Sequence, residues 1–289
     1  MKIAYIIHAY KLPGQLARLV NSLSSPNSYF FIHIDKKVNI LPFKESLEKV
    51  QSKNIIWVKR EYSNWGTISC VKAVLNGLLE ALEYKDNIEY FYCLSGQEYP
   101  IKPKSYIDIF LNNNKNTNFI KYFPLPYTGW KGGGMHRYNR YHFIISKNRY
   151  LRRLVNIINF FLPRRKIPYN LKPFGGEFYI GLSRKSVEYI KNFIQTHPLY
   201  IPFFKYSYIP EEFFFQTILL NGPKEISDNI NNKILTYIDW NKPKGPYPAT
   251  LDITDISKLK NSECLFARKF DINIDNKILD LIDNKLLNK

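Results

Sequence analysis

Cysteine is scarce in this chain of 289 residues: there are three, and none forms a CxxC pair or a Cys/His spacing typical of a metal site. Cys70 falls in a predicted apolar helix and Cys93 in a predicted strand, so we expect both to be reduced residues of the core. Reduced core thiols suit a reducing compartment. The cysteine pattern therefore favours neither disulfides nor a thiolate metal centre.

Long apolar runs are also missing. No run approaches the ~20 residues needed to cross a bilayer, and the longest apolar cluster, residues 154–162, is interrupted by Asn156 and Asn159. Met1 and Lys2 lead directly into a predicted strand, so we expect no signal peptide. These absences predict a cytoplasmic protein.

Acidic residues are few compared with basic ones: Asp and Glu number 24 against 42 Lys and Arg, which gives a net charge of +18. Such a charge fits simple solubility, nucleic acid, an anionic membrane face or phosphate-bearing ligands. Nucleic acid is the less favoured partner, because the aromatic residues lie mostly in apolar runs rather than in a basic stacking platform.

The first hundred residues alternate between strand and helix patterns. Short apolar runs are separated by segments whose apolar residues recur at i, i+3, i+4 and i+7. This alternation predicts an α/β fold with a mostly parallel sheet flanked by helices on both faces. The expected strands are residues 4–7, 30–34, 55–58 and 90–94, and the expected helices are residues 14–23 and 67–84.

Beyond residue 112 the pattern is less regular. The chain contains no internal repeat, low-complexity linker or sharp boundary, so we expect a single domain. Its second half is expected to hold strands at 119–123 and 177–182, helices at 185–195 and 211–220, and loops at 132–134 and 241–248.

Polar residues stand at the carboxyl ends of two predicted strands. His8 follows the first apolar run, and Asp35 follows the second. In open α/β sheets, ligands bind outside these strand ends. We therefore expect a small-molecule site framed by His8 and Asp35.

The turn LSGQEYP, residues 94–100, follows directly from the fourth predicted strand. The carboxylate of Glu98 is suited to hold sugar hydroxyls. Turns with Gly and Pro at strand ends are common, so this motif alone is a weak indication.

The segment PEEFFFQT, residues 210–217, places two acids before three phenylalanines. Acids in a first helical turn stabilise the helix dipole, which is a purely structural explanation. A carboxylate at the mouth of a buried helix can also have a raised pKa and serve as a general base. Glu212 is therefore a candidate base.

The segment LFARKF, residues 265–270, places Arg268 and Lys269 between aromatic residues. The two cations are either solvated charges at the end of an element or a phosphate clamp, since Arg offers a fork of donors and Lys a point charge.

Two further segments have an open interpretation. Residues 130–137 are either a mobile loop near a substrate or an ordinary exposed loop. Residues 147–166 carry basic residues around an apolar stretch, which fits either a surface lying on an anionic membrane or a solvated helix face. The basic residues are Arg149, Arg152, Arg153, Arg164, Arg165 and Lys166.

Taken in order, the motifs resemble glycosyltransferase family 14, which contains the core-2/I-branching β-1,6-N-acetylglucosaminyltransferases and the peptide O-xylosyltransferases. Each motif is weak alone, but together they span residues 3–270 in the family's order. They are IAYIIHAY, FFIHIDKK, SNWGTIS, LSGQEYPIK, GGEFYIGLSR, PEEFFFQT, DWNKPKG and LFARKF.

The resemblance implies a GT-A-type, Rossmann-like fold in one domain, residues 1–289. Residues 1–112 would form the nucleotide-binding half, and residues 113–289 the irregular acceptor-binding and catalytic half. It also implies an inverting glycosyltransferase that uses a UDP-sugar and needs no metal or other cofactor. The absence of an Asp-x-Asp motif, the usual metal site of GT-A enzymes, is consistent with this expectation.

The resemblance also implies roles for individual residues. Glu212 matches the family's catalytic base, and Arg268 and Lys269 match residues that hold the donor diphosphate. The nucleoside would be contacted by Asp35 and His8. The donor or acceptor sugar would be contacted by Glu98, Glu177 and Trp240.

Two departures leave the donor sugar open. Glu98 stands where the family usually has Asp, and Gly176-Glu177 replaces a common Gly-Ser pair. We expect UDP-N-acetylglucosamine first and UDP-xylose second. The expected acceptor is a surface glycan or a lipid-linked glycan.

The chain lacks the membrane anchor and stem of the animal enzymes, which indicates a bacterial cytoplasmic member, with peripheral contact at an anionic membrane as one option. Two other classes remain as alternatives. A glycoside hydrolase would pair Glu212 with a second acid, Glu98 or Glu177, and a nucleic-acid-binding protein would explain the charge.

Overall fold

A large, mostly parallel sheet forms the centre of the computed structural model, which describes residues 1–143, 157–159, 161–241 and 247–287. Its strand order is β10-β6-β9-β4-β1-β2-β3, and only β9 runs antiparallel to its neighbours. The expected α/β fold with a mostly parallel sheet is thereby confirmed. The strands are β1 (Ile3–Ala9), β2 (Ser28–Ile34), β3 (Ile55–Trp57), β4 (Tyr90–Ser95), β6 (Asn118–Phe119), β9 (Gly181–Ser183) and β10 (Ile230–Asn231).

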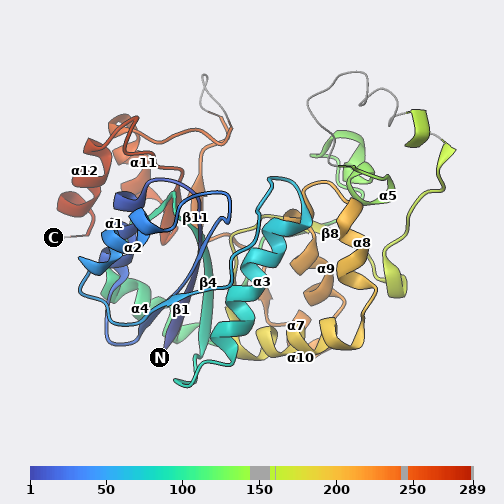
Figure 1. The fold of residues 1–289 in the computed structure, drawn as a ribbon, viewed down its shortest axis with the longest axis horizontal. Helices are drawn as coiled ribbons and strands as arrows, with labels where there is room; N and C mark the ends of the chain where they lie inside the picture. The colour runs from blue at the N-terminus through green and yellow to red at the C-terminus, as the bar shows by residue number, and fades with distance from the viewer. Residues whose placement is uncertain (144–156, 160, 242–246, 288–289) are drawn as a thin grey trace.

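Helices cover both faces of this sheet, as Figure 1 shows. Strands buried on both faces read as continuous apolar runs, which is why β1, β2 and β4 are the clearest strands in the sequence. One face packs against α1 (Pro13–Leu23), α2 (Leu41–Glu48), α4 (Lys104–Asn113), α11 (Ile256–Asn261) and α12 (Lys277–Lys285). The other packs against α3 (Ile68–Leu82), α7 (Arg184–Thr196), α8 (Tyr200–Phe203), α9 (Phe214–Leu220) and α10 (Lys224–Ser227).

Alternating side chains of β1 show how the two faces form. Tyr5 and Ile7 belong to the first apolar cluster, whereas Ala4 and Ile6 belong to the second. Each cluster contains residues from before and after residue 112. The two halves of the sequence therefore share both cores.

Two small sheets extend the central one toward its carboxyl edge. In the first, β12 (Phe266–Arg268) lies between β11 (Thr236–Ile238), which is parallel to it, and β5 (Glu98–Pro100), which is antiparallel. In the second, β7 (Tyr122–Pro124) pairs antiparallel with β8 (Phe174–Gly176). These sheets bring the second half of the chain to the strand ends of the first.

Several predicted elements are corrected in the second half. The expected strand 119–123 is two strands, β6 and β7, because the chain leaves the large sheet there and pairs with β8 instead. The expected strand 177–182 is limited to β9, with β8 ending at Gly176. By contrast, the expected loop 132–134 is confirmed as a turn within η1 (Lys131–Gly134), because Gly132 and Gly133 have non-helical, positive φ angles of 59° and 68°. The short helix α5 (His136–Asn139) follows it.

The expected helix 211–220 is also divided. Glu211 and Glu212 lie in a separate 3-10 turn, η4 (Pro210–Glu212), and α9 starts at Phe214. Phe213 lies between them with non-helical angles, φ −151° and ψ −3°, and its ring is fully buried, so the helix is interrupted at a residue of the core.

Other predictions concern thiols and membranes. All three thiols are free, and Cys93 is buried, whereas Cys70 and Cys264 are partly exposed. In the ranges described above, no helix is both long and apolar enough to cross a membrane.

The basic segment lies largely outside the described residues, including Arg149, Arg152 and Arg153. Within the described part, Arg164 and Lys166 are exposed. Arg165 instead donates to the backbone oxygen of Tyr206 at 2.8 Å, and it also donates to the backbone oxygen of Phe203. Arg165 therefore does not belong to a free basic face.

Candidate active site

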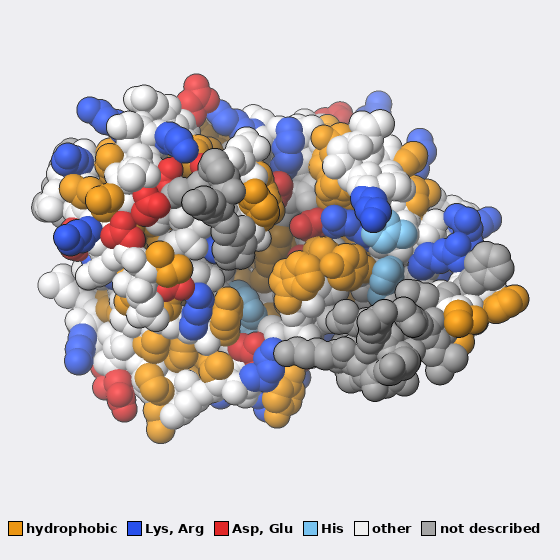
Figure 2. Space-filling view, turned by 90° about the horizontal axis from the view of Figure 1, so that it is seen from above, with side chains coloured by type: hydrophobic (Ala, Val, Ile, Leu, Met, Phe, Trp, Pro, Cys, Tyr) orange, Lys and Arg blue, Asp and Glu red, His pale blue; other side chains and the backbone are white. Residues whose placement is uncertain are grey.

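Polar side chains meet where β1, β2 and β4 end. His8 of β1 is in register with His33 of β2 and with Ser95 of β4, so three polar residues form a row across the carboxyl edge. Figure 2 views this edge from above and shows a hollow near the middle of the molecule, with acidic, basic and histidine side chains around it. The sequence-based expectation of polar groups at this edge is confirmed.

Asp35 follows β2 and is held in a fixed position. Its side chain is buried, and Oδ1 accepts hydrogen bonds from the backbone N–H of Lys37 at 2.9 Å and of Ser63 at 3.4 Å. The Lys37 ammonium lies 3.4 Å from Oδ2. Asp35 is therefore an oriented carboxylate beside His8 and His33.

The histidines of this row form a close pair. Nδ1 of His8 lies 3.0 Å from Nδ1 of His33, and the rings stack at 4.9 Å. Burial lowers the pKa of each histidine to about 4. Both rings are therefore neutral near pH 7.

Glu98 and Arg268 are opposite one another in the small sheet, in register between β5 and β12. Glu98 Oε1 lies 2.9 Å from Arg268 Nε in an ion pair without aligned hydrogen-bond geometry, and Glu98 also accepts from the backbone N–H and hydroxyl of Ser95. Burial raises the pKa of Glu98 to about 7, while Arg268 opposes the rise.

Full burial bears on the role expected for Glu98. Its side chain has no exposed surface in this structure, so its observed contact is with Arg268 rather than with the open site, and its contact with a sugar stays a prediction. The Arg268 guanidinium lies 4.3 Å from the centre of the Tyr179 ring, so it is held on a second side as well.

Lys269 extends the positive charge next to Arg268. Burial lowers the pKa of the Lys269 ammonium, and the neighbouring charges of Arg268 and Lys11 lower it further. Lys11 itself forms an ion pair of 2.7 Å with Asp271. Three cations therefore gather at this end of the site, and Lys11, which follows β1, was not identified from the sequence.

Glu212 lies in the 3-10 turn η4, just before α9. Its side chain is 27% exposed and forms an ion pair with Arg137. Burial raises the pKa of Glu212, and Arg137 opposes the rise. The guanidinium of Arg137 also lies 3.6 Å from the centre of the Trp130 ring. Segment 130–137, whose role was open in the sequence, thus places a cation on the candidate base.

The carboxyl group of Glu177 is influenced by the charges of both Glu212 and Arg268. Burial raises its pKa to about 7; the nearby charge of Glu212 adds to the rise, while Arg268 opposes it. Glu177 therefore lies within the influence of both the candidate base and the candidate clamp. Gly176 allows this placement, because a Cβ there would collide with the backbone oxygen of Lys121.

Trp240 stands at the rim. It lies two residues after Ile238, which is in register with Arg268, and its side chain is 47% exposed. An exposed indole at this position is available to stack on a sugar ring.

Glu211 is a buried carboxyl group next to Glu212. It is 7% exposed, and its Oε2 has no hydrogen-bond partner. Burial raises its pKa to about 7. Sequence spacing alone does not distinguish the two neighbouring acids, but the structure does: only Glu212 is paired with Arg137.

The described part of the chain contains no group of three or more His, Cys, Asp or Glu residues arranged to hold a metal ion.

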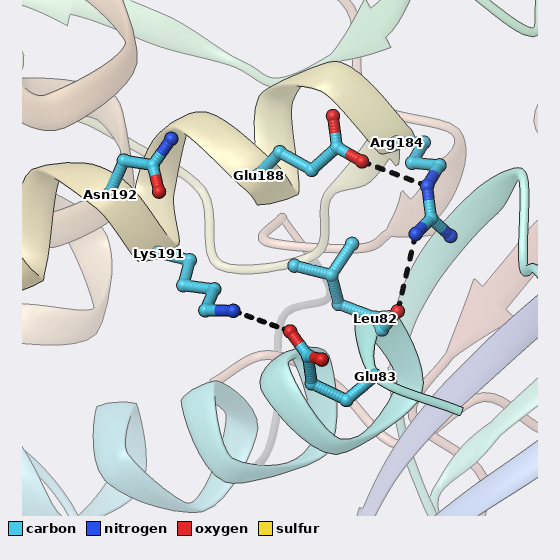
Figure 3. A pocket seen from close by; sticks show the side chains of 6 residues that line it. All are labelled: Leu82, Glu83, Arg184, Glu188, Lys191 and Asn192. Atoms are coloured by element: carbon cyan, nitrogen blue, oxygen red, sulfur yellow. Dashed lines mark hydrogen bonds and ion pairs between the residues drawn. The ribbon is translucent and has the colours of Figure 1, made fainter. Parts of the chain in front are cut away.

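A separate depression of about 260 Å³ lies between α3 and α7 (Figure 3). Lys191 pairs there with Glu83 at 2.5 Å, and Arg184 pairs with Glu188 at 2.9 Å. Arg184 also binds the backbone oxygen of Ile88, just before β4 begins. This depression is therefore near the amino ends of the strands, away from the candidate site.

Comparisons with known proteins indicate the family of the chain. A family model described as "Branch: Core-2/I-Branching enzyme" matches residues 3–261, a range that ends before Arg268 and Lys269. Beta-glucuronosyltransferase GlcAT14A of Arabidopsis thaliana is 29% identical and covers 100% of this chain. Xylosyltransferase 2 of Mus musculus is 28% identical and covers 98%.

The chain spans 65% of the length of the plant relative and 33% of the mouse relative. Among solved structures, 4-diphosphocytidyl-2C-methyl-D-erythritolsynthase from Anaerococcus prevotii DSM 20548 is 12% identical, with a TM-score of 0.35. That match covers 68% of this chain and 76% of the other, and no conclusion is drawn from so low a similarity.

Proposed function

The chain belongs to the Core-2/I-branching enzyme family, and on this premise we propose that it is an inverting glycosyltransferase. It moves a sugar from a UDP-sugar to a hydroxyl group of a glycan acceptor. The observation that carries the proposal is that residues 177–179 contact elements of both candidate groups. Gln216 of α9 donates to the backbone oxygen of Glu177 at 2.7 Å, and the Arg268 guanidinium lies 4.3 Å from the centre of the Tyr179 ring. These contacts support a single site that contains a candidate base, just before α9, and a candidate phosphate clamp.

Glu212 is the general base in this proposal. Inversion by single displacement needs one base that removes the proton of the acceptor hydroxyl, much as an inverting hydrolase activates water. Partial burial makes the carboxylate a stronger base, and the Arg137 ion pair keeps it ionised and oriented.

Arg268 and Lys269 stabilise the departing UDP. Negative charge develops on the diphosphate as the glycosidic bond breaks, and fixed cations lower the energy of that state. Glu98 and Tyr179 hold Arg268 in place before the nucleotide arrives. We propose that these cations serve in place of a metal, so that the enzyme needs no cofactor.

The nucleoside binds at the ends of β1 and β2. Asp35 offers a fixed carboxylate for ribose or base N–H and O–H groups, because backbone N–H groups of Lys37 and Ser63 orient it. His8 lies beside it.

We propose a neutral donor sugar, UDP-N-acetylglucosamine first and UDP-xylose second. Relatives named as a xylosyltransferase and a glucuronosyltransferase raise the question of UDP-glucuronate. The ionised carboxylate of Glu212 argues against that acidic sugar, and Glu177 adds to the repulsion whenever it is ionised, since like charges in a partly buried site repel one another.

The acceptor in this proposal is a surface glycan, or a lipid-linked glycan reached by peripheral contact with an anionic membrane, and the enzyme works in the cytoplasm. Trp240 at the rim suits stacking on an acceptor sugar.

The pair Glu177 and Glu212 also fits a second candidate function. A glycoside hydrolase needs one protonated acid and one ionised carboxylate, and the pKa of Glu177 near 7 beside Glu212 resembles such a pair. A hydrolase would release sugar from a glycan without UDP.

One assay separates the two functions. The protein is incubated with each UDP-sugar and a panel of oligosaccharides in EDTA, and products are identified by mass spectrometry and NMR. A new glycosidic bond with released UDP supports the transferase. Shortened oligosaccharides without added nucleotide would support the hydrolase.

A further inference from the structure

The hydrogen bond between the two histidines at the carboxyl edge has a defined donor and a defined acceptor. His8 and His33 are neighbours in register on parallel strands, and both side chains face the α3 side of the sheet. Their Nδ1 atoms are 3.0 Å apart, which requires one to donate and the other to accept.

A backbone group decides which one donates. The N–H of Glu61 lies 2.8 Å from Nε2 of His33. A backbone N–H can only donate, so Nε2 of His33 is the acceptor and carries no proton. The neutral ring of His33 then carries its proton on Nδ1 and donates it to His8. In turn, His8 accepts at Nδ1 and carries its own proton on Nε2.

The Nε2–H group of the His8 ring is available to donate a hydrogen bond to a ligand. No described residue forms a hydrogen bond with Nε2 of His8, and the side chain is partly exposed at the strand edge. The charged groups that influence the pair are Asp35, Lys37 and Arg60. Burial outweighs them and keeps both rings neutral near pH 7.

We infer that His33 is a positioning residue that fixes His8 as an Nε2–H donor, and that His8 gives this hydrogen bond to an acceptor oxygen of the bound nucleotide. The ligand in this inference rests on the proposed function. Asp35 accepts and His8 donates, so the nucleotide meets one fixed acceptor and one fixed donor at adjacent strand ends. A histidine ring free to exchange tautomers could present either a donor or an acceptor at Nε2, and the nucleotide would not meet a fixed donor there.

Nitrogen NMR of the full chain with ¹⁵N-labelled histidine tests the tautomers directly. We expect His8 to show a protonated Nε2 and an unprotonated Nδ1, and His33 to show the reverse, at pH 7 without ligand. A protonated Nδ1 on His8 would overturn the inference. This measurement needs neither UDP nor an altered protein.

Two substitutions of His33 then test the consequence. His33→Asn keeps a donor close to the position of Nδ1, whereas His33→Gln keeps an acceptor near Nε2 for Glu61 but offers no donor to His8. Calorimetry should show UDP affinity within about threefold of wild type for His33→Asn and about tenfold weaker for His33→Gln. In the Gln variant, the NMR signals of His8 should also lose the pure Nε2–H pattern.

Equal UDP affinities in the two variants, with His8 unchanged, would contradict a positioning role for His33. A wild-type protein that does not bind UDP would overturn the proposed function and the ligand named here, while the tautomers would still be read from the NMR spectrum. The two failures are therefore distinguishable.

Discussion

Arg137 forms an ion pair with Glu212 although the two residues are 75 positions apart in the sequence. The guanidinium is stacked on Trp130 on its other side. A cation so held keeps the carboxylate ionised at a lower pH than burial alone would allow. The pair therefore sets the pH range in which Glu212 acts as a base.

Replacing Arg137 with Gln should move the acid limb of the kcat/KM profile to higher pH. Arg137 lowers the pKa of Glu212, so its removal raises that pKa, and the base is ionised only at higher pH. The measurement is transfer rate against pH. Arg137→Lys, which keeps a positive charge, should shift the limb less. An acid limb that stays in place in both variants would argue that Glu212 is not the titrating base.

Replacing Glu212 with Gln should lower kcat by about 10³, because general base catalysis contributes about 10²–10⁴. UDP binding should stay within about threefold of wild type, since the diphosphate clamp is intact. Glu211→Gln is the matched control, as it removes the neighbouring carboxyl group and leaves the Arg137 pair in place. Comparable losses of activity in the two variants would remove the special role of Glu212.

Replacing Lys269 with Ala should weaken UDP binding about tenfold and uridine binding less than twofold, because only UDP carries the diphosphate. The control is Lys233→Ala, which removes the same charge from the exposed Lys233–Glu263 pair. Lys269 is a cleaner test than Arg268, whose loss would leave the buried Glu98 without its charge partner. Equal weakening of UDP and uridine would exclude a diphosphate clamp at Lys269.

Glu211→Gln should stabilise the fold at high pH. The folded-state pKa of Glu211, about 7, exceeds the unfolded value of 4.5, so ionisation of this group disfavours the folded state. The gain in unfolding free energy should reach about 2–3 kcal/mol above pH 7 and vanish below pH 4.5. Denaturant unfolding at pH 5 and pH 8 measures it. A gain that does not depend on pH would show that Glu211 is not the titrating group.

Much of the first half was predictable because its signals are local. The buried strands β1, β2 and β4 are continuous apolar runs, and α1 and α3 carry a clear helical period. Strand ends in a parallel sheet lie along one edge, so the convergence of His8 and Asp35 followed from the sequence.

The second half was harder because tertiary packing decides its local structure. Phe213 leaves helical geometry to bury its ring, which separates Glu212 from α9. The short strand β12 is placed by β5 and β11, which come from distant parts of the chain.

Among site residues, Glu98 shows most clearly what could not be predicted from the sequence. Its position in a turn is visible in the sequence, but its complete burial against Arg268 depends on a cross-strand register. The tautomer of His8 likewise depends on the backbone of Glu61, which no local motif indicates.

Calorimetric titration of the full chain with UDP, UDP-N-acetylglucosamine, UDP-xylose and UDP-glucuronate in EDTA, repeated with manganese, tests the central claim most directly. We expect UDP to bind in EDTA with a Kd on the order of micromolar, manganese to change it little, and the neutral sugar nucleotides to bind more tightly than UDP-glucuronate. Absence of UDP binding in both conditions would contradict the proposed glycosyltransferase, and binding only with manganese would contradict the clamp formed by Arg268 and Lys269.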